Sequence, residues 1–249
     1  MKSKRKAIGI MSFPSVCFLI IFSCLWISVN GEEIVKLKAH QANYDVSIKG
    51  LTAKLETSLR KTDTFKYSAE DNIKAMGLAS IFLKGTMLST AEFLIKEEGI
   101  KPLHFYAKDT ISKENKELTL DFDWALKQVN IKEAQLTSSM PINDNTKDRI
   151  TLKYALMRDL INNRLPDQYS LYEGGEIKKI KTTNIGVKII TLENSEYKVV
   201  GIQNQALGSS KKSILWCAEE LGFLPILIEQ YRNDKLWLSA KLVNYKEIT

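Results

Sequence analysis

Residue types that commonly carry chemistry are sparse in this sequence. The 249-residue chain has two histidines, His40 and His104, and three cysteines. The histidines lack the paired spacing of metal ligands, and both lie in or beside strand-like sequence. We interpret them as surface residues or as core residues with satisfied hydrogen bonds. The sequence therefore predicts neither a metal site nor a cofactor.

Cys217 is the first candidate nucleophile, and it lies between Trp216 and Ala218 in an apolar run. A catalytic thiol needs a neighbouring histidine or a helix N-terminus to lower its pKa, and the sequence suggests neither. We therefore interpret Cys217 as a buried structural residue.

Asp121 and Asp123 are the second candidate, because they share one face of a predicted strand. Paired carboxylates serve glycoside hydrolysis and calcium binding. Two acids on the solvent face of a strand are far more common, however. Gly-x-Ser-x-Gly, His-Glu-x-x-His and phosphate-binding glycine loops are absent. We predict no catalytic residues and no enzyme, with a hydrolase acting through this pair as the least favoured function.

Large apolar side chains are the remaining candidates for a binding site. A curled sheet needs bulky residues on its concave face, and a covering helix fills that face. If the helix packs fully, these residues form an ordinary core, which is the favoured interpretation. If it leaves a gap, they line an apolar slot for acyl chains. The candidate slot residues are Phe122, Trp124, Tyr154, Met157, Trp216 and Trp237.

The elements that must position these residues are mostly strands. Apolar and polar residues alternate most cleanly over 117–124. The stretch 44–59 reads as one long strand whose apolar phase flips at Gly50, as a β-bulge or sharp bend would cause. Three apolar runs between 213 and 242 predict a closing meander. Turn signals recur at hairpin-like intervals and predict about ten or eleven strands.

One helix is predicted, over Ile150–Leu165. Its apolar residues recur at steps of three and four, Asp148 can cap its start, and Pro166 follows its end. Residues 75–82 are ambiguous between a short helix and a strand. The predicted fold class is mainly β, a long curled antiparallel sheet forming a half-open barrel with the main helix on its concave face.

The N-terminus has the layout of a secretory signal peptide. A basic start is followed by an apolar run over residues 7–29, and small residues precede Glu32. The predicted organisation is a signal peptide over 1–31, a lead-in over 32–43 and a single β-rich domain over 44–249, located in the periplasm. An alternative stays open, in which residues 7–29 remain uncleaved as an inner-membrane anchor.

Charge and cysteine usage follow from this segment. The predicted signal peptide holds four of the 36 basic residues, so the remaining chain has 32 basic and 29 acidic residues. It also holds two of the three cysteines, so the remaining chain cannot form an internal disulfide. No basic cluster is interleaved with aromatics, so nucleic-acid binding is not expected. We interpret Lys178–Lys181 and Lys211–Lys212 as ordinary charged strand ends.

Four stretches in order resemble a known family: Tyr44–Leu59 with its central Gly50, Gly99–Tyr106 with its Gly-x-x-Pro, Leu120–Trp124 with its Asp-Trp, and Trp216–Glu229 with its Trp and Pro-apolar signature. The first of these, Tyr44–Leu59, resembles one long strand with a central glycine at Gly50. Together the four stretches resemble domain of unknown function family 3108, exported proteins of Gram-negative bacteria, over residues 44–242. The resemblance implies an exported β-rich protein without an assigned activity. It also implies a fold similar to the half-open barrel of periplasmic lipoprotein carriers.

These observations leave a ranked set of functions. The first is non-enzymatic binding of a lipid, a lipoprotein or another apolar envelope component. The alternative is a structural or interaction module with a filled core and no small ligand, whose partner is another envelope protein. Membrane contact is expected only through the N-terminal segment, if that segment stays uncleaved.

Overall fold

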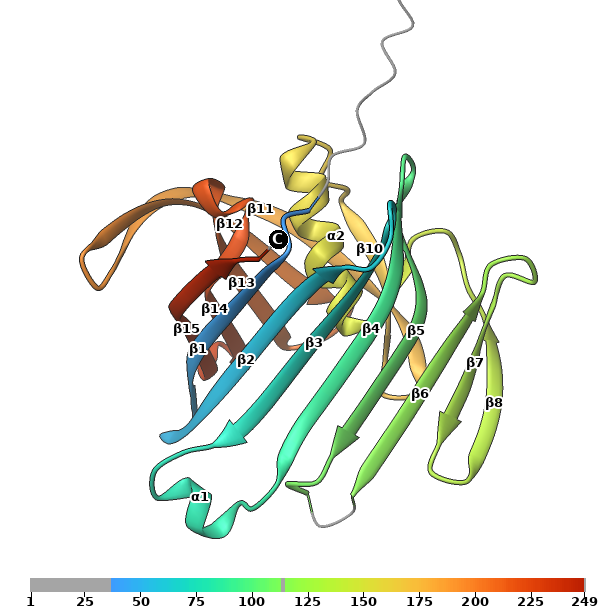
Figure 1. Ribbon diagram of the computed structural model, residues 1–249, viewed down its shortest axis with the longest axis horizontal. Coiled ribbons are helices and arrows are strands. Elements are labelled where there is room, and N and C mark those ends of the chain that lie inside the picture. The colour runs from blue at the N-terminus through green and yellow to red at the C-terminus, as the bar shows by residue number, and fades with distance from the viewer. Residues whose placement is uncertain (1–36, 113–114, 249) are drawn as a thin grey trace, which may run out of the picture. The chain divides into compact units, whose positions relative to one another are not determined.

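Antiparallel hairpins follow one another along almost the whole chain (Figure 1). The computed structural model describes residues 37–112 and 115–248. The predicted signal peptide and residues 32–36 of the lead-in lie outside these ranges. The described strands form one 15-stranded sheet in the order β8-β7-β6-β5-β4-β3-β2-β1-β15-β14-β13-β12-β11-β10-β9.

The strands of the first half are β1 His40–Ile48, β2 Leu51–Lys61, β3 Lys66–Ala75, β4 Thr86–Lys96, β5 Gly99–Asp109, β6 Lys116–Asp123, β7 Gln128–Glu133 and β8 Leu136–Pro141. Those of the second half are β9 Thr146–Lys147, β10 Gln168–Glu173, β11 Glu176–Leu192, β12 Ser195–Ala206, β13 Lys211–Ala218, β14 Leu224–Arg232 and β15 Lys235–Glu247. The helices are α1 Ala79–Phe82, α2 Arg149–Ile161 and the 3₁₀ helix η1 Glu219–Leu221.

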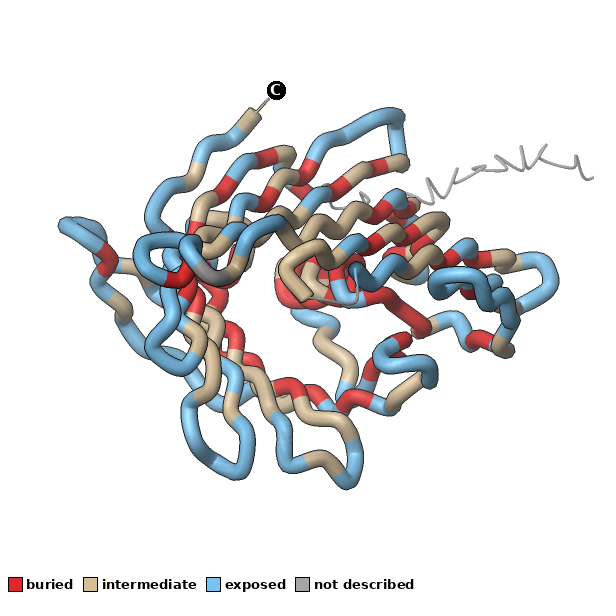
Figure 2. The backbone as a smooth tube through the Cα atoms, turned by 90° about the horizontal axis from the view of Figure 1, so that it is seen from below, coloured by how far each residue is buried: buried red, intermediate tan, exposed pale blue. Residues whose placement is uncertain are grey.

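The first and last strands meet in the middle of the sheet. β1 pairs antiparallel with β15, while β8 and β9 form the two free edges. The pairs are antiparallel except that of β9 with β10. The sheet curls around α2 without closing (Figure 2). The predicted fold class, a mainly β half-open barrel with the main helix on its concave face, is confirmed.

The apolar phase flip at Gly50 has a different cause from the one predicted. Ile48 pairs with Leu51, and the two residues between them have positive φ, 50° at Lys49 and 84° at Gly50. This is a two-residue hairpin turn, for which glycine is well suited. The predicted bulge within one long strand is wrong. The phase changes because the chain reverses and the paired residues face the same side of the sheet.

The predicted helix is confirmed as α2, and its start is capped as expected. The Asp148 carboxylate accepts hydrogen bonds from the backbone N–H groups of Ile150 and Thr151, and the Thr151 hydroxyl accepts one from the Asp148 N–H. The helix ends at Ile161, earlier than predicted, because Asn163 has a φ of 52°. The ambiguous stretch 75–82 becomes the end of β3, a turn and α1.

Two strands escaped prediction, for different reasons. β8 is exposed along almost its full length, and β9 has two residues. The sequence predicts separate strands around Ile177–Thr182 and Gly186–Leu192, but the structure has the single 17-residue strand β11 there. Its pairing with β12 shifts register between Asn184 and Val187, which explains the glycine found there.

α2 fills one half of the concave face. Lys153 Nζ lies 2.9 Å from the Asp71 carboxylate on β3. Arg158 donates hydrogen bonds to the carbonyl oxygens of Lys96 and Glu97 after β4. Tyr154 stacks on Phe93, with ring centroids 5.6 Å apart. These contacts hold the helix against β3–β5.

Candidate functional site

The other half of the concave face contains a cavity of about 630 Å³ between α2 and strands β10–β14. Its floor is apolar, with Leu152 from α2, Leu171 from β10 and Ile180 from β11. All three are buried in the core. The volume lies in the range of small-molecule sites.

Strand register determines which side chains reach this cavity. Ile180 pairs with Ala206, and both line the cavity. On the next pair of strands, Lys211 is opposite Arg232. Side chains alternate between the two faces of a strand, so Lys211 lies on the same face of β13 as Leu215, four residues later. Leu215 is buried in the core. The hairpin ends therefore supply the mouth of the cavity and the strand interiors its floor.

The mouth of the cavity is basic. Five lysine or arginine residues line it against two acids, Glu173 and Glu176. Both acids are engaged by Lys178, whose Nζ lies 3.1 Å from Glu173 and 3.7 Å from Glu176. The hydrogen bond to Glu173 raises the pKa of Lys178. The positive charge of the mouth is therefore only partly neutralised.

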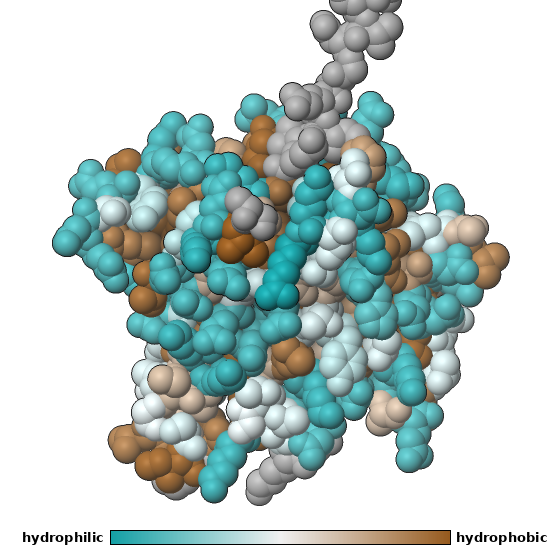
Figure 3. Space-filling view, viewed as in Figure 1, coloured by the Kyte–Doolittle hydropathy of each residue, from teal (hydrophilic) through white to brown (hydrophobic). Residues whose placement is uncertain are grey.

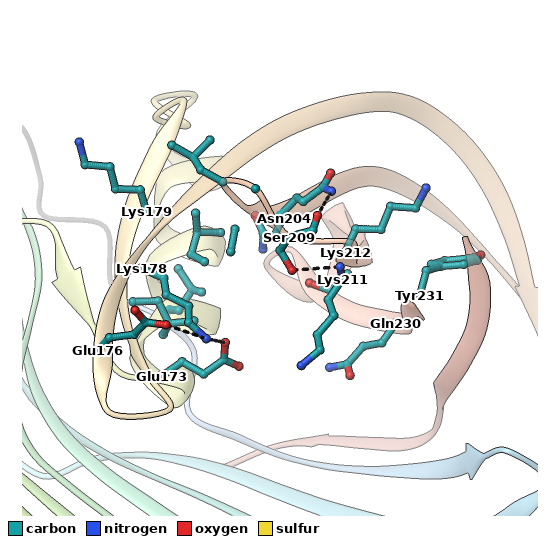
Figure 4. A pocket seen from close by; sticks show the side chains of 18 of the residues that line it. Glu173, Glu176, Lys178, Lys179, Asn204, Ser209, Lys211, Lys212, Gln230 and Tyr231 are labelled. Atoms are coloured by element: carbon teal, nitrogen blue, oxygen red, sulfur yellow. Dashed lines mark hydrogen bonds and ion pairs between the residues drawn. The ribbon is translucent and has the colours of Figure 1, made fainter. Parts of the chain in front are cut away.

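Lys211 and Arg232 carry most of the remaining charge, and Lys179 carries the rest. Neither Lys211 nor Arg232 has a carboxylate partner among residues 37–112 and 115–248, and the Arg232 guanidinium lies 3.6 Å above the centroid of the Trp237 ring. Lys212 is instead bound to Asp234 at 2.6 Å, which lowers the pKa of that carboxyl. Lys211 and Gln230 project into the open space opposite Glu173 (Figure 4).

This arrangement can hold a ligand with two chemical parts. An apolar group fits against Leu152, Leu171 and Ile180, and an anionic group fits beside Lys211. Within the described parts of the chain, no three His, Cys, Asp or Glu side chains are grouped so as to hold a metal ion. Among the described residues, those that line the cavity include no histidine or cysteine that could act as a base or nucleophile.

The six predicted slot residues do not share one cavity, and none lines the 630 Å³ cavity. Phe122 and Trp124 stack at the end of β6, with centroids 6.1 Å apart. Trp124 Nε1 donates a hydrogen bond to the Pro102 carbonyl oxygen at 2.6 Å, and Lys101 Nζ lies 4.6 Å from its ring centroid.

Tyr154 and Met157 lie on α2. Tyr154 is fully buried between Phe93 and His40, so it belongs to the filled half of the core. Met157 lines a smaller cavity of about 300 Å³ beside η1.

Trp216 and Trp237 lie in the second half of the sheet. Trp216 alternates with the buried Leu215 and Cys217 and therefore faces the opposite side. There it covers Gly201, and its Nε1 donates to Glu229 at 3.0 Å. Trp237 is half-buried at the register shift between β14 and β15. A binding role for the six residues stays a prediction.

The other chemical candidates have structural partners. His104 Nδ1 lies 2.7 Å from the exposed Asp121 carboxylate. Asp123 accepts hydrogen bonds from the N–H groups of Ala125 and Leu126. Cys217 is buried, and burial raises the pKa of its thiol.

Sequence reasoning missed the residues that form the cavity mouth. Lys178 and Lys211 were interpreted as ordinary charged strand ends, although each begins a strand after a glycine-containing turn. That pattern was the available signal. The sequence does not show the strand register that brings these two strand starts to the same opening of the cavity.

Comparisons with known proteins agree with this fold. A crystal structure titled as a beta-barrel-like protein of domain of unknown function DUF1849 from Brucella abortus superposes with a TM-score of 0.60 at 13% identity, covering 86% of this chain and 99% of that one. At this identity the likeness concerns the fold alone. No curated protein matches the sequence. The family model described as "Protein of unknown function (DUF3108)" matches residues 43–234. The chain therefore belongs to the DUF3108 family, as its four sequence stretches indicated.

Proposed function

We propose that this protein is a non-enzymatic binding protein of the periplasm that holds a lipid-like component of the envelope in its concave cavity. The observation that carries the proposal is the combination of an apolar floor with a basic mouth in one cavity of about 630 Å³. Such a combination suits an amphipathic ligand whose chain lies inside and whose negative group lies at the opening. Free lipid and the acyl part of a lipoprotein both present this chemistry.

The energetics of such a site are adequate for binding. Removing about 200 Å² of an acyl chain from water contributes about 5 kcal/mol. The charge of Lys211 acts at an exposed position, so it adds on the order of 0–1 kcal/mol and weakens with salt. We therefore expect the floor to supply most of the affinity and the mouth to orient the ligand.

Native mass spectrometry tests the proposal. Full-length protein purified without detergent should carry a species of lipid mass, or take up phosphatidylglycerol offered to it. Ala206→Trp should fill the cavity and reduce uptake at least tenfold. Val243→Trp is the matched control, because Val243 is exposed on β15 and away from the cavity. A protein that carries no lipid and takes none up contradicts the proposal.

A free sheet edge favours a second function, that of a protein-interaction module. β8 is an exposed edge strand, and such strands pair readily with an added strand from a partner. Thr137→Pro would remove a backbone donor from this edge. If this change abolished function in the cell while Ala206→Trp did not, the interaction module would replace the lipid-binding protein.

We also propose that no reaction is catalysed at the acidic pair on β6. Asp121→Asn with Asp123→Asn should leave the cellular phenotype unaltered. Loss of function with an intact circular dichroism spectrum would instead favour a hydrolase.

A further inference from the structure

Exposed apolar side chains gather at one open end of the half-barrel. Three connections lie at this end: those between β1 and β2, between β3 and β4, and between β14 and β15. The strand register shows this, because Ile48 pairs with both Leu51 and Leu238, and Ala53 pairs with Ala75. We name the apolar residues of these turns the rim: Leu51, Met76, Leu78, Ile81 and Leu236, all exposed. Leu78 is the extreme case, with 80% of its surface exposed.

Backbone contacts join these turns into one surface. The Met76 N–H donates to the Thr52 carbonyl oxygen at 2.9 Å, which holds the α1 segment against the start of β2. On the other side, the Lys49 N–H donates to the Trp237 carbonyl oxygen at 3.2 Å. Hydrophobic side chains cluster over α1 and its neighbouring turn, with hydrophilic ones beside them (Figure 3).

Lysines flank the rim without neutralising partners. Lys49, Lys74, Lys84 and Lys235 all lie in or next to these turns and are exposed. None has an ion pair with a carboxylate within the described ranges, whereas the nearby Asp234 is held by Lys212. The end of the molecule therefore combines exposed leucines, isoleucine and methionine with unpaired positive charge.

We propose that the rim docks onto an anionic lipid surface, with its apolar side chains in the headgroup region and its lysines against lipid phosphates. Monomeric soluble proteins rarely expose contiguous apolar patches without a function. Apolar residues flanked by lysines are the composition of interfacial membrane binding. Positive charge without carboxylate partners favours a lipid surface over a protein partner here.

Docking in this orientation also places the cavity at the membrane. Lys211 begins β13 and Arg232 ends β14, so both residues lie at the same end of the sheet as the rim. Both also line the cavity mouth. A ligand could therefore pass between bilayer and cavity at this end. The docking itself rests on rim residues and not on cavity occupancy.

A site-specific fluorescence experiment tests the proposal in the full chain. In a background of Cys17→Ser and Cys24→Ser, Leu78→Cys is labelled with an environment-sensitive dye, while the buried Cys217 stays unlabelled. Leu126→Cys is the matched control, since Leu126 is also largely exposed, at 67%, but lies between β6 and β7 at the opposite end. Both labels sit on the same chain with the same N-terminal segment.

With phosphatidylcholine vesicles containing phosphatidylglycerol, the label at position 78 should shift to the blue and be quenched by brominated lipid. The label at position 126 should do neither. Replacing Lys49, Lys74 and Lys84 together by glutamate should weaken apparent vesicle affinity by at least about a hundredfold, since one lysine contributes about fivefold near an anionic surface.

Three results would overturn the proposal. One is equal quenching at both positions, which would mean that the N-terminal segment or unspecific adsorption brings the protein to the vesicle. Another is absence of quenching at position 78. The last is a response of that label to envelope protein extract but not to vesicles. A cavity that binds no lipid would leave this test intact, because the label reports docking of the empty protein as well.

Discussion

Gly201→Ala offers a direct test of the packing on the outer face of β12. A Cβ atom at this position would lie 2.5 Å from Trp216 Cζ3 and 2.7 Å from Ile185 Cγ1. Trp216 cannot easily move away, because Lys188 Nζ lies 3.5 Å above its ring and its Nε1 is bonded to Glu229. The glycine is therefore required by close approach of a side chain and not by backbone conformation.

Overpacking of this kind costs about 1–3 kcal/mol in the free energy of unfolding. For a domain of this size the melting temperature should fall by roughly 2–10 °C. Urea denaturation followed by circular dichroism measures the free energy. Trp216→Ala should remove the contacts with the indole ring and leave the one with the exposed Ile185 side chain, which has room to move. Gly201→Ala should therefore cost at least about 1 kcal/mol less in that background than alone.

Gly50→Ala is the matched control for the same chemical change. Gly50 has a φ of 84° and no atom within 4 Å of its ideal Cβ position. Alanine there should cost about 1–2 kcal/mol through backbone strain alone, with no rescue by Trp216→Ala. If the Gly201 and Trp216 substitutions are additive within about 0.5 kcal/mol, the close-approach argument fails.

Further predictions concern α2 and two buried ionisable groups. Asp148→Ala should lower the free energy of unfolding by about 2 kcal/mol, because two backbone N–H groups lose their acceptor. Asp148→Asn should retain most of the stability that the cap contributes, because an asparagine side chain also accepts these hydrogen bonds. Urea denaturation measures both changes. Burial lowers the pKa of His40, so as the pH falls below about 6.5 the unfolded state takes up a proton on this ring before the folded state does. The free energy of unfolding should therefore decrease as the pH is lowered through this range. His40→Gln should flatten that part of the curve, and an unchanged curve would contradict the assignment. Burial lowers the pKa of Lys147 to about 8, so stability should rise from pH 8 towards 10.5, and Lys147→Met should abolish the rise in denaturation curves.

Short-range patterns predicted much of this fold, because they depend on neighbouring residues. The capping aspartate and apolar repeat located α2, and strict alternation located β6. At Gly50 the alternation located a break in the strand pattern, but the bulge predicted from it is wrong. A bulge and a two-residue hairpin turn both shift the apolar phase by one residue, so the pattern does not distinguish them. β8 lacked a buried face and so gave no pattern to detect.

The cavity depends on longer-range relations, which one sequence does not specify. Alternation shows that Trp216 and Cys217 face opposite sides, but both are apolar, so it does not show which side is concave. Likewise, Lys178 and Lys211 reach one opening only through the registers of β11, β12 and β13. Charge clusters at strand starts could have marked these residues as candidates, but not as neighbours.

The cavity itself follows from the way in which α2 is anchored. Lys153 and Arg158 tie the helix to β3 and to the end of β4, and Tyr154 is buried in the first half of the sheet. In the second half, Leu152 is the one α2 side chain among the described residues that lines the 630 Å³ cavity. A helix held by polar contacts on one side cannot shift to fill the other without leaving those partners unsatisfied. The helix therefore fills one half of the concave face, and the cavity of about 630 Å³ remains in the other.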